Sequence, residues 1–234
     1  MLHHLTQPMV AASRRWRKTA GWLSVCLLTV LTGCDHFPVL NRVHTAFDFA
    51  MFGQPDVPIS RVDIDKLPYA SIRAKMGRSG KVLMILGRYD GNDLHWISAD
   101  NAVIATRNGR IVKTVGLKND IRETRFPDPD PIALGAHKLT QPAIHIRLVD
   151  FLAEQHFSVI VKSVLQRTRR ENITILEREY DTFVIREDNE VEQLGWSYTN
   201  VFWVDADTGF VWRSIQYFSP SLPPIEIDIL KPAG

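Results

Sequence analysis

The chain consists mainly of short runs of β-branched, aromatic and other apolar residues, separated by clusters of turn-forming residues. Such runs predict β-strands. They cover residues 71–76, 81–89, 94–98, 103–107, 110–115, 143–151, 157–167, 172–179, 181–186, 198–204, 210–218 and 225–229. The last run, Ile-Glu-Ile-Asp-Ile, alternates strictly, so we expect one of its faces to be buried and the other solvated.

The turn residues indicate how the strands connect. Asn108-Gly109 lies between two such runs and predicts a type I′ hairpin, which requires positive φ at both central residues. We therefore expect residues 59–125 to form an antiparallel meander.

A proline-rich segment at residues 126–142 interrupts this pattern, with prolines at 127, 129 and 131. Proline supports neither a helix interior nor a strand ladder, so we interpret the segment as a linker or a long sheet crossover. Strands resume in residues 143–234, which we expect to pack on the first meander as one unit. Arg167, Arg169 and Arg170 are typical of a solvated turn, and a basic helix over residues 157–170 is a second interpretation.

These patterns predict an all-β, antiparallel fold, sandwich-like or barrel-like, with one or two short helices. One helix is expected over residues 37–53, where Leu40, Val43 and Phe47 share a face and Pro55 prevents continuation. This face is expected to pack on the body of the protein, and contact with a membrane is the alternative.

The first 33 residues are typical of an export signal. Four basic residues within residues 14–18 precede an apolar run over residues 21–31, and no acidic residue occurs before Cys34. The run is too short to span a bilayer, which takes about 20 apolar residues. It ends in Leu-Thr-Gly-Cys, which resembles the lipobox of bacterial lipoproteins. We expect cleavage between Gly33 and Cys34 and lipidation of the Cys34 thiol, so that residues 34–58 form a lipid-anchored segment.

Three details of this signal carry alternatives. Ser13-Arg14-Arg15 partly resembles a twin-arginine signal, but Arg17 favours the general secretion route. Translation starts at Met1 or at Met9. Asp35, directly after Cys34, resembles an inner-membrane retention signal.

Removal of the signal changes the composition. The full chain of 234 residues carries a formal net charge of +2, which is too small to indicate a nucleic-acid partner. Residues 34–234 carry a formal net charge of −2 and retain Cys34 as their one cysteine, so they form no internal disulfide. Their stability has to come from burial and hydrogen bonding.

Candidate chemistry is sparse. The histidines form no HxxxH or HxH pair, so the sequence predicts no metal site and no cofactor. Residues 205–209, Asp-Ala-Asp-Thr-Gly, resemble the start of a calcium loop, but a hairpin turn explains them better because Gln216 stands where the loop needs a glutamate. Asp128 and Asp130 are either an acid–base pair or solvated linker residues.

Tryptophans on predicted strands are the remaining candidates. Most strand tryptophans belong to a core, and an exposed tryptophan face that stacks on sugar rings is the alternative. The candidate contacts to a polysaccharide or a partner protein are Trp96, Asp100, Arg110 and Trp212.

Several of these segments together resemble the YjbF/GfcB family of capsule and exopolysaccharide lipoproteins. They are Leu-Pro-Tyr-Ala-Ser-Ile at 67–72, Trp-Ile-Ser-Ala-Asp at 96–100, Thr-Arg-Asn-Gly-Arg-Ile-Val at 106–112, Asp-Ala-Asp-Thr-Gly-Phe-Val-Trp at 205–212 and Pro-Pro-Ile-Glu-Ile at 223–227. The resemblance implies coiled, bifurcated sheets and a periplasm-facing lipoprotein of the cell envelope without known catalytic residues. It implies as partners an outer-membrane β-barrel and periplasmic proteins of the same polysaccharide cluster. It favours the outer membrane, whereas Asp35 leaves the inner membrane possible.

Two hypotheses of function follow. The first is a non-enzymatic accessory factor in capsule or exopolysaccharide assembly or secretion, which binds protein or polysaccharide. The second is a polysaccharide-modifying or hydrolysing enzyme that uses a carboxylate pair, such as Asp93 with Asp100 or Asp205 with Asp207.

Overall fold

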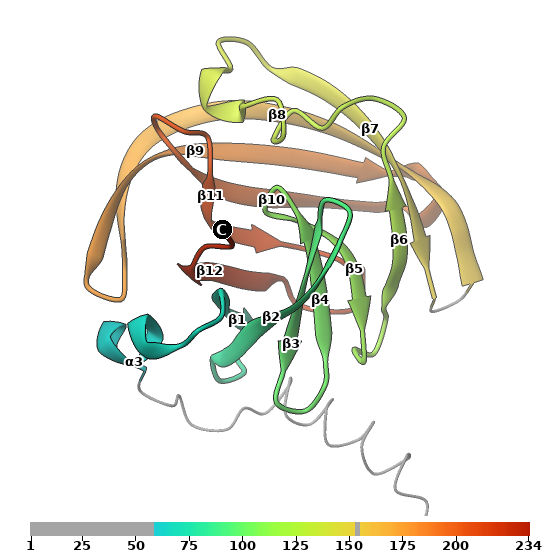
Figure 1. Ribbon diagram of the computed structural model, residues 1–234. Helices are drawn as coiled ribbons and strands as arrows, with labels where there is room; N and C mark the ends of the chain where they lie inside the picture. The colour runs from blue at the N-terminus through green and yellow to red at the C-terminus, as the bar shows by residue number, and fades with distance from the viewer. Residues whose placement is uncertain (1–58, 153–154) are drawn as a thin grey trace, which may run out of the picture. The chain divides into compact units, whose positions relative to one another are not determined.

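The computed structural model describes residues 59–152 and 155–234. The helix expected over residues 37–53 and the lipidation site at Cys34 lie outside the described residues. The described part is nearly all β, as expected, with one α-helix (Figure 1). No helix within it is long and apolar enough to cross a membrane.

Twelve strands of the described part form a single antiparallel sheet in the order β5-β4-β3-β2-β1-β12-β11-β10-β9-β8-β7-β6. The strands are β1 Ser71–Met76, β2 Val82–Asp90, β3 Asp93–Ser98, β4 Val103–Arg107, β5 Arg110–Val115, β6 Ile121–Arg125, β7 Ala143–Phe151, β8 His156–Ile175, β9 Arg178–Val191, β10 Trp196–Asp205, β11 Val211–Gln216 and β12 Ile225–Lys231. The helices are α3 Arg61–Lys66 and the short 3₁₀ turns η1 Ala136–Lys138 and η3 Glu192–Leu194. β6 and α3 were not predicted from the sequence.

The predicted turn at Asn108-Gly109 is confirmed, with φ of 50° at Asn108 and 83° at Gly109 between β4 and β5. Glycine is also required there by close packing. A Cβ on Gly109 would lie 2.5 Å from the Cβ of Val211.

The predictions for residues 157–186 need correction. Three short strands were expected, but the chain forms two long ones, β8 and β9, joined at residues 176–177. The helical alternative is wrong because burial alternates along β8, where Val159, Val161 and Leu165 are buried and their neighbours face out. The predicted solvated turn at Arg167, Arg169 and Arg170 is also wrong. These residues lie within β8, around an irregularity in its pairing with β9.

The sheet is nearly closed. β5 and β6 are the two ends of the strand order, yet they are consecutive in the chain and lie beside each other (Figure 1). Thr124 Oγ1 of β6 donates a hydrogen bond to the Val112 carbonyl at 3.0 Å, and the Ile121 amide donates to Thr114 Oγ1 at 3.0 Å. Threonine side chains therefore join the two edges in place of a strand ladder.

The inner face of the sheet holds the main core, which includes Ile72, Trp96, Phe151, Val161 and Ile227. A second inner cluster forms where the proline-rich crossover packs on the sheet. There Ile132 and Ala136 contact residues of β8 to β11, among them Leu165, Phe202 and Val211. The crossover is therefore part of the core rather than an independent linker.

A third cluster lies apart from these two. It joins Ile64 of α3 to Ile173 and Ile175 near the tip of the β8–β9 hairpin, and to Trp203 and Leu230. Arg61 fixes this layer, because its guanidinium donates to the carbonyls of Ile175, Leu176 and Leu230 at 2.7–3.3 Å. The hairpin tip is thus tied to α3 and β12.

Candidate functional site

A hollow of about 660 Å³ lies where several turns meet at one end of the sheet. We call it the hairpin-end cleft. Its walls are the β2–β3, β4–β5 and β10–β11 turns, the crossover and the last residues of the chain. The lining residues are Tyr89, Gly91, Asn92, Leu94, Asn108, Ile132, Ala133, Gly135, Thr208, Gly209, Phe210, Val211, Ala233 and Gly234.

The β10–β11 turn is held by Asp205. Its Oδ1 accepts hydrogen bonds from the amides of Asp207 and Thr208 and from Thr208 Oγ1, at 2.8–3.2 Å. Its Oδ2 accepts from Trp212 Nε1 at 2.9 Å. The predicted hairpin turn is therefore confirmed, and the calcium interpretation finds no support because donors already surround the carboxylate.

Gly209 lets a buried histidine approach the wall of this cleft. A Cβ on Gly209, whose φ is +79°, would lie 2.5 Å from His137 Nδ1. His137 is buried in the crossover, and neither of its ring nitrogens has a hydrogen-bond partner within the described part of the chain.

The lining of the hairpin-end cleft combines aromatic, aliphatic and polar side chains, and none of them is charged. Tyr89 is 54% exposed and Phe210 38%. The side-chain amides of Asn92 and Asn108 have no partner among the described residues. Flat apolar rings beside free amide donors and acceptors suit a ligand that carries both C–H faces and hydroxyl groups.

Trp212, a predicted contact residue, does not line the hairpin-end cleft but packs against Phe210, which does. Its ring packs edge-on against Phe210, with centroids 4.7 Å apart, and lies tilted against the ring of Tyr180, with centroids 4.0 Å apart. Trp212 is half-buried. It therefore positions Phe210, which faces the cleft.

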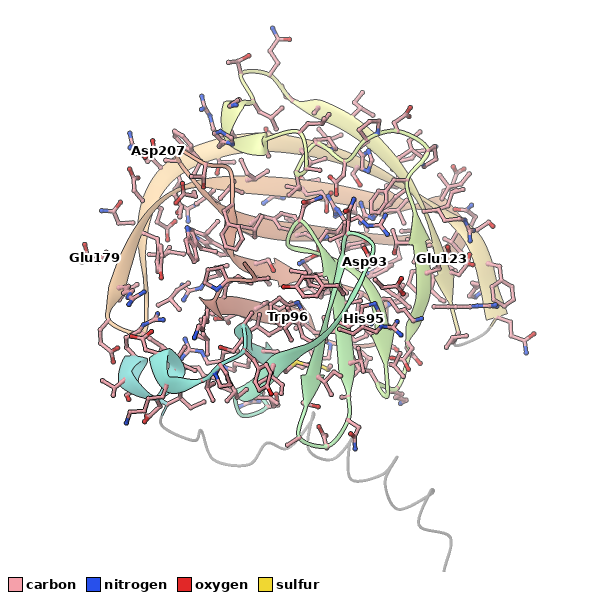
Figure 2. The ribbon with its side chains drawn as sticks, viewed as in Figure 1. Asp93, His95, Trp96, Glu123, Glu179 and Asp207 are labelled. Carbon is pink, nitrogen blue, oxygen red and sulfur yellow. The ribbon has the colours of Figure 1, made fainter. Side chains whose placement is uncertain are left out.

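The other three predicted contact residues lie elsewhere. Trp96 is 1% exposed, and its Nε1 donates to Thr106 Oγ1 at 2.8 Å inside the core (Figure 2). Asp100 is exposed on the β3–β4 turn, where Ser98 donates to its carboxylate. The four candidates do not form one site.

Arg110 is 1% exposed and belongs to a buried ionic network. Its Nε lies 2.5 Å from Asp130 Oδ2, and its Nη2 lies 2.7 Å from Glu187 Oε1. Asp130, interpreted as a solvated linker residue or as half of an acid–base pair, is instead a buried partner of Arg110, while Asp128 is exposed. Both interpretations of Asp130 are therefore wrong.

Glu187 is the centre of this network and was not identified from the sequence. It is fully buried on β9 and also accepts a hydrogen bond from Asn200 at 2.8 Å, while Arg147 approaches it at 3.4 Å. Burial alone would raise the pKa of Glu187, but Arg110 and Arg147 lower it to about 2. The network is charge-balanced and satisfied, which is the form in which buried charges are tolerated.

A second hollow, which we call the polar cleft, measures about 330 Å³. It is lined by Asp90, Asp93, His95, Arg107, Val112, Lys113, Arg122, Glu123 and Thr124. Figure 2 shows Asp93 and His95 on β3 close to Glu123 on β6. Burial and the nearby Arg88 lower the pKa of His95, which keeps this side chain neutral at pH 7.

The carboxylate pairs considered for an enzyme are not arranged for catalysis. Asp93 begins β3 and Asp100 follows its end, so they lie about 20 Å apart along the strand. Asp205 is fully engaged in its turn, as described above. No group of three or more His, Cys, Asp or Glu side chains in the described ranges is arranged to hold a metal ion.

Comparison with known proteins gives consistent matches. The family model described as "Group 4 capsule polysaccharide lipoprotein gfcB, YjbF" matches residues 44–230. The "Uncharacterized lipoprotein GfcB" of Escherichia coli (strain K12) is 28% identical over 204 residues, covering 87% of this chain and 94% of the relative. The "Uncharacterized lipoprotein YjbF" of the same strain is 24% identical over 217 residues, covering 92% and 99%.

A solved structure shares the fold. The crystal structure of the hypothetical lipoprotein YmcC from Escherichia coli (K12) superposes with a TM-score of 0.68 at 28% sequence identity. The match covers 75% of this chain and 90% of that chain.

Proposed function

Given that the chain belongs to the YjbF/GfcB family of group 4 capsule polysaccharide lipoproteins, we propose that it is a non-enzymatic accessory factor in capsule or exopolysaccharide assembly or secretion. In this role it is anchored to the outer membrane through Cys34, faces the periplasm and binds the polymer in the hairpin-end cleft. The proteins of the same polysaccharide cluster are its proposed partners.

The observation that carries the proposal is the chemistry of the cleft wall. Two exposed aromatic rings, Tyr89 and Phe210, stand beside the unpaired amides of Asn92 and Asn108 in a hollow of about 660 Å³. Sugar rings present an apolar C–H face to an aromatic ring and hydroxyls to an amide, so each part of the wall has a matching part of the ligand.

The experiment is direct binding of purified capsule polymer or its oligosaccharides to the protein, measured by calorimetry. Tyr89→Ala and Phe210→Ala are each expected to weaken binding about tenfold, because a well-packed aromatic contact contributes about 1–2 kcal/mol. Tyr69→Ala is the matched control, since Tyr69 is also 54% exposed but lies outside the cleft. Equal affinity of all three variants and the parent protein would overturn the proposed site.

The anchor is tested separately. Cys34→Ala removes the thiol that is proposed to carry the lipid, so the protein is expected to leave the membrane fraction on flotation and to appear in the soluble envelope extract. A variant that still floats with membranes would contradict lipid attachment at this residue.

A further inference from the structure

The two clefts lie on opposite sides of one hairpin. Successive residues of a strand point to opposite faces, and the β2–β3 pairing places Tyr89 opposite Leu94 and Asp90 opposite Asp93. Tyr89 and Leu94 line the hairpin-end cleft, whereas Asp90 and Asp93 line the polar cleft. The next hairpin repeats the arrangement, with Asn108 in one cleft and Arg107 in the other.

Each carboxylate of the polar cleft contacts an arginine. Arg107 binds Asp93 through two contacts of 2.5 and 2.9 Å. Arg88 pairs with Asp90 at 3.0 Å. Arg125 pairs with Glu123 at 2.8 Å and is shared with Asp150 at 3.0 Å.

Two cations in the polar cleft remain without such a partner. Neither the Lys113 ammonium nor the Arg122 guanidinium has an ion-pair or hydrogen-bond partner within the described residues, although Arg122 is near enough to Asp150 to help lower the pKa of that carboxyl. Thr124 lies on the same wall, and His95 adds a neutral imidazole. The wall therefore offers two unpaired positive charges, which is the chemistry that binds an oxyanion.

From this geometry we infer that the polar cleft binds an acidic substituent, a carboxylate or a phosphate, of the same polymer whose neutral sugars occupy the hairpin-end cleft. The inference rests on the proposed function, because it takes the ligand to be a polysaccharide. It adds that the ligand is anionic and that it crosses the exposed β2–β3 turn at Gly91 and Asn92. Lys113 and Arg122 are the residues that select it.

The test uses the full-length lipidated protein in detergent and three oligosaccharides. One contains uronic acid, the second is its carboxyl-reduced neutral form, and the third is linked by phosphodiesters. The parent protein is expected to bind at least one charged oligosaccharide about tenfold more tightly than the neutral one, because hydrogen bonds to charged groups contribute about 1.5–3 kcal/mol. The charged oligosaccharide that binds more tightly identifies the oxyanion. Equal affinity for all three would overturn the inference.

Lys113→Ala combined with Arg122→Ala is expected to remove this preference and leave binding of the neutral oligosaccharide unchanged. Lys66→Ala combined with Arg78→Ala is the control, since both residues are exposed, lie outside the cleft and change the net charge equally. An equal loss in the control pair would show a general charge effect and would contradict the site.

The two proposals fail in distinguishable ways. In one outcome, Tyr89→Ala and Phe210→Ala leave all binding intact, while the variant at Lys113 and Arg122 loses the charged ligand. The hairpin-end cleft is then not the sugar-binding site, and the anion site in the polar cleft is supported. In the other outcome, the aromatic variants weaken the binding of all three oligosaccharides and the variant at Lys113 and Arg122 changes none of the affinities. The sugar-binding site is then supported and the anion site is overturned.

Discussion

At the scale of single residues, Arg110 shows how a side chain suited to surface recognition acts inside the protein. It lies in the β4–β5 hairpin, directly after a confirmed turn, where an exposed side chain is common. Its position is explained by Asp130, 20 residues away, and by Glu187, 77 residues away. No local pattern reveals such distant partners, so burial of this arginine was not predictable from the sequence.

Glu187 is the residue on which the network depends most. Glu187→Gln leaves Arg147 without its carboxylate and Arg110 with Asp130 alone. The substitution is expected to lower the free energy of unfolding by about 3 kcal/mol, because breaking a buried ion pair from one side leaves an uncompensated charge. Urea unfolding followed by tryptophan fluorescence measures this change.

Glu190→Gln is the matched control on the same strand. Glu190 is exposed, so its substitution is expected to change the free energy of unfolding by less than about 0.5 kcal/mol. Similar small effects in both variants would contradict a structural role for the network.

At the scale of elements, the alternating pattern predicted most strands, and the bounds of β1, β4, β5 and β7 agree with the structure residue for residue. β6 was missed because Ile121 is its one strong apolar residue, and because it is stabilised by pairing with β7 and by two threonine contacts. α3 was missed because six residues carry little periodicity, although Ser60 and Asp63 form a capping box.

The hairpin-end cleft could not be predicted from the sequence, for a different reason. Each of its turns was recognisable from the sequence, and Asn108 and Gly209 were assigned to turns. That these turns meet at one end of the sheet depends on the strand order, in which β3 and β10 are far apart. Tyr89 and Phe210 consequently carried no signal of a shared site.

The contact between α3 and the β8–β9 hairpin tip leads to a prediction at this scale. Arg61→Ala removes three hydrogen bonds to the carbonyls of Ile175, Leu176 and Leu230. Amide hydrogen exchange over residues 173–180 is expected to become about tenfold faster or more, because the tip loses its tie to β12. Exchange in β3 and β4 is expected to stay unchanged.

Lys66→Ala provides the comparison on the same helix, since Lys66 is exposed. It is expected to leave exchange at the hairpin tip at the parent rate. If exchange at the hairpin tip also stays at the parent rate in Arg61→Ala, the tip is held by its apolar contacts alone.

At the scale of the whole described part, stability is linked to pH through the buried network. The pKa of Glu187 is lowered from its ordinary 4.5 to about 2, and the Asp130 carboxyl is lowered in the same direction by Arg110 despite its burial. Carboxyls with a depressed pKa in the folded state stabilise it at every pH above the ordinary value. That stabilisation is lost as the pH falls towards the folded-state value.

The expected result is a loss of about 3 kcal/mol from Glu187 between pH 4.5 and pH 2, with no contribution of Glu187 to the pH dependence near neutrality. Urea midpoints measured at intervals over this range test the prediction. In Glu187→Gln this part of the loss is expected to be absent, so the two proteins should converge in stability as the pH falls. Parallel curves would contradict the assignment.

The pairing of β1 with β12 joins the first and the last strand of the described chain in the middle of the strand order. During synthesis from the amino end, β1 lacks its second neighbour until residues 225–231 have been made, so the sheet is completed last and from distant parts of the chain. A chain that stops before Ile225 would keep two open strand edges, at β1 and β11, each able to pair with another molecule. β12 therefore protects the protein, because it covers the edges of β1 and β11. A chain truncated before β12 exposes both edges to aggregation and proteolysis.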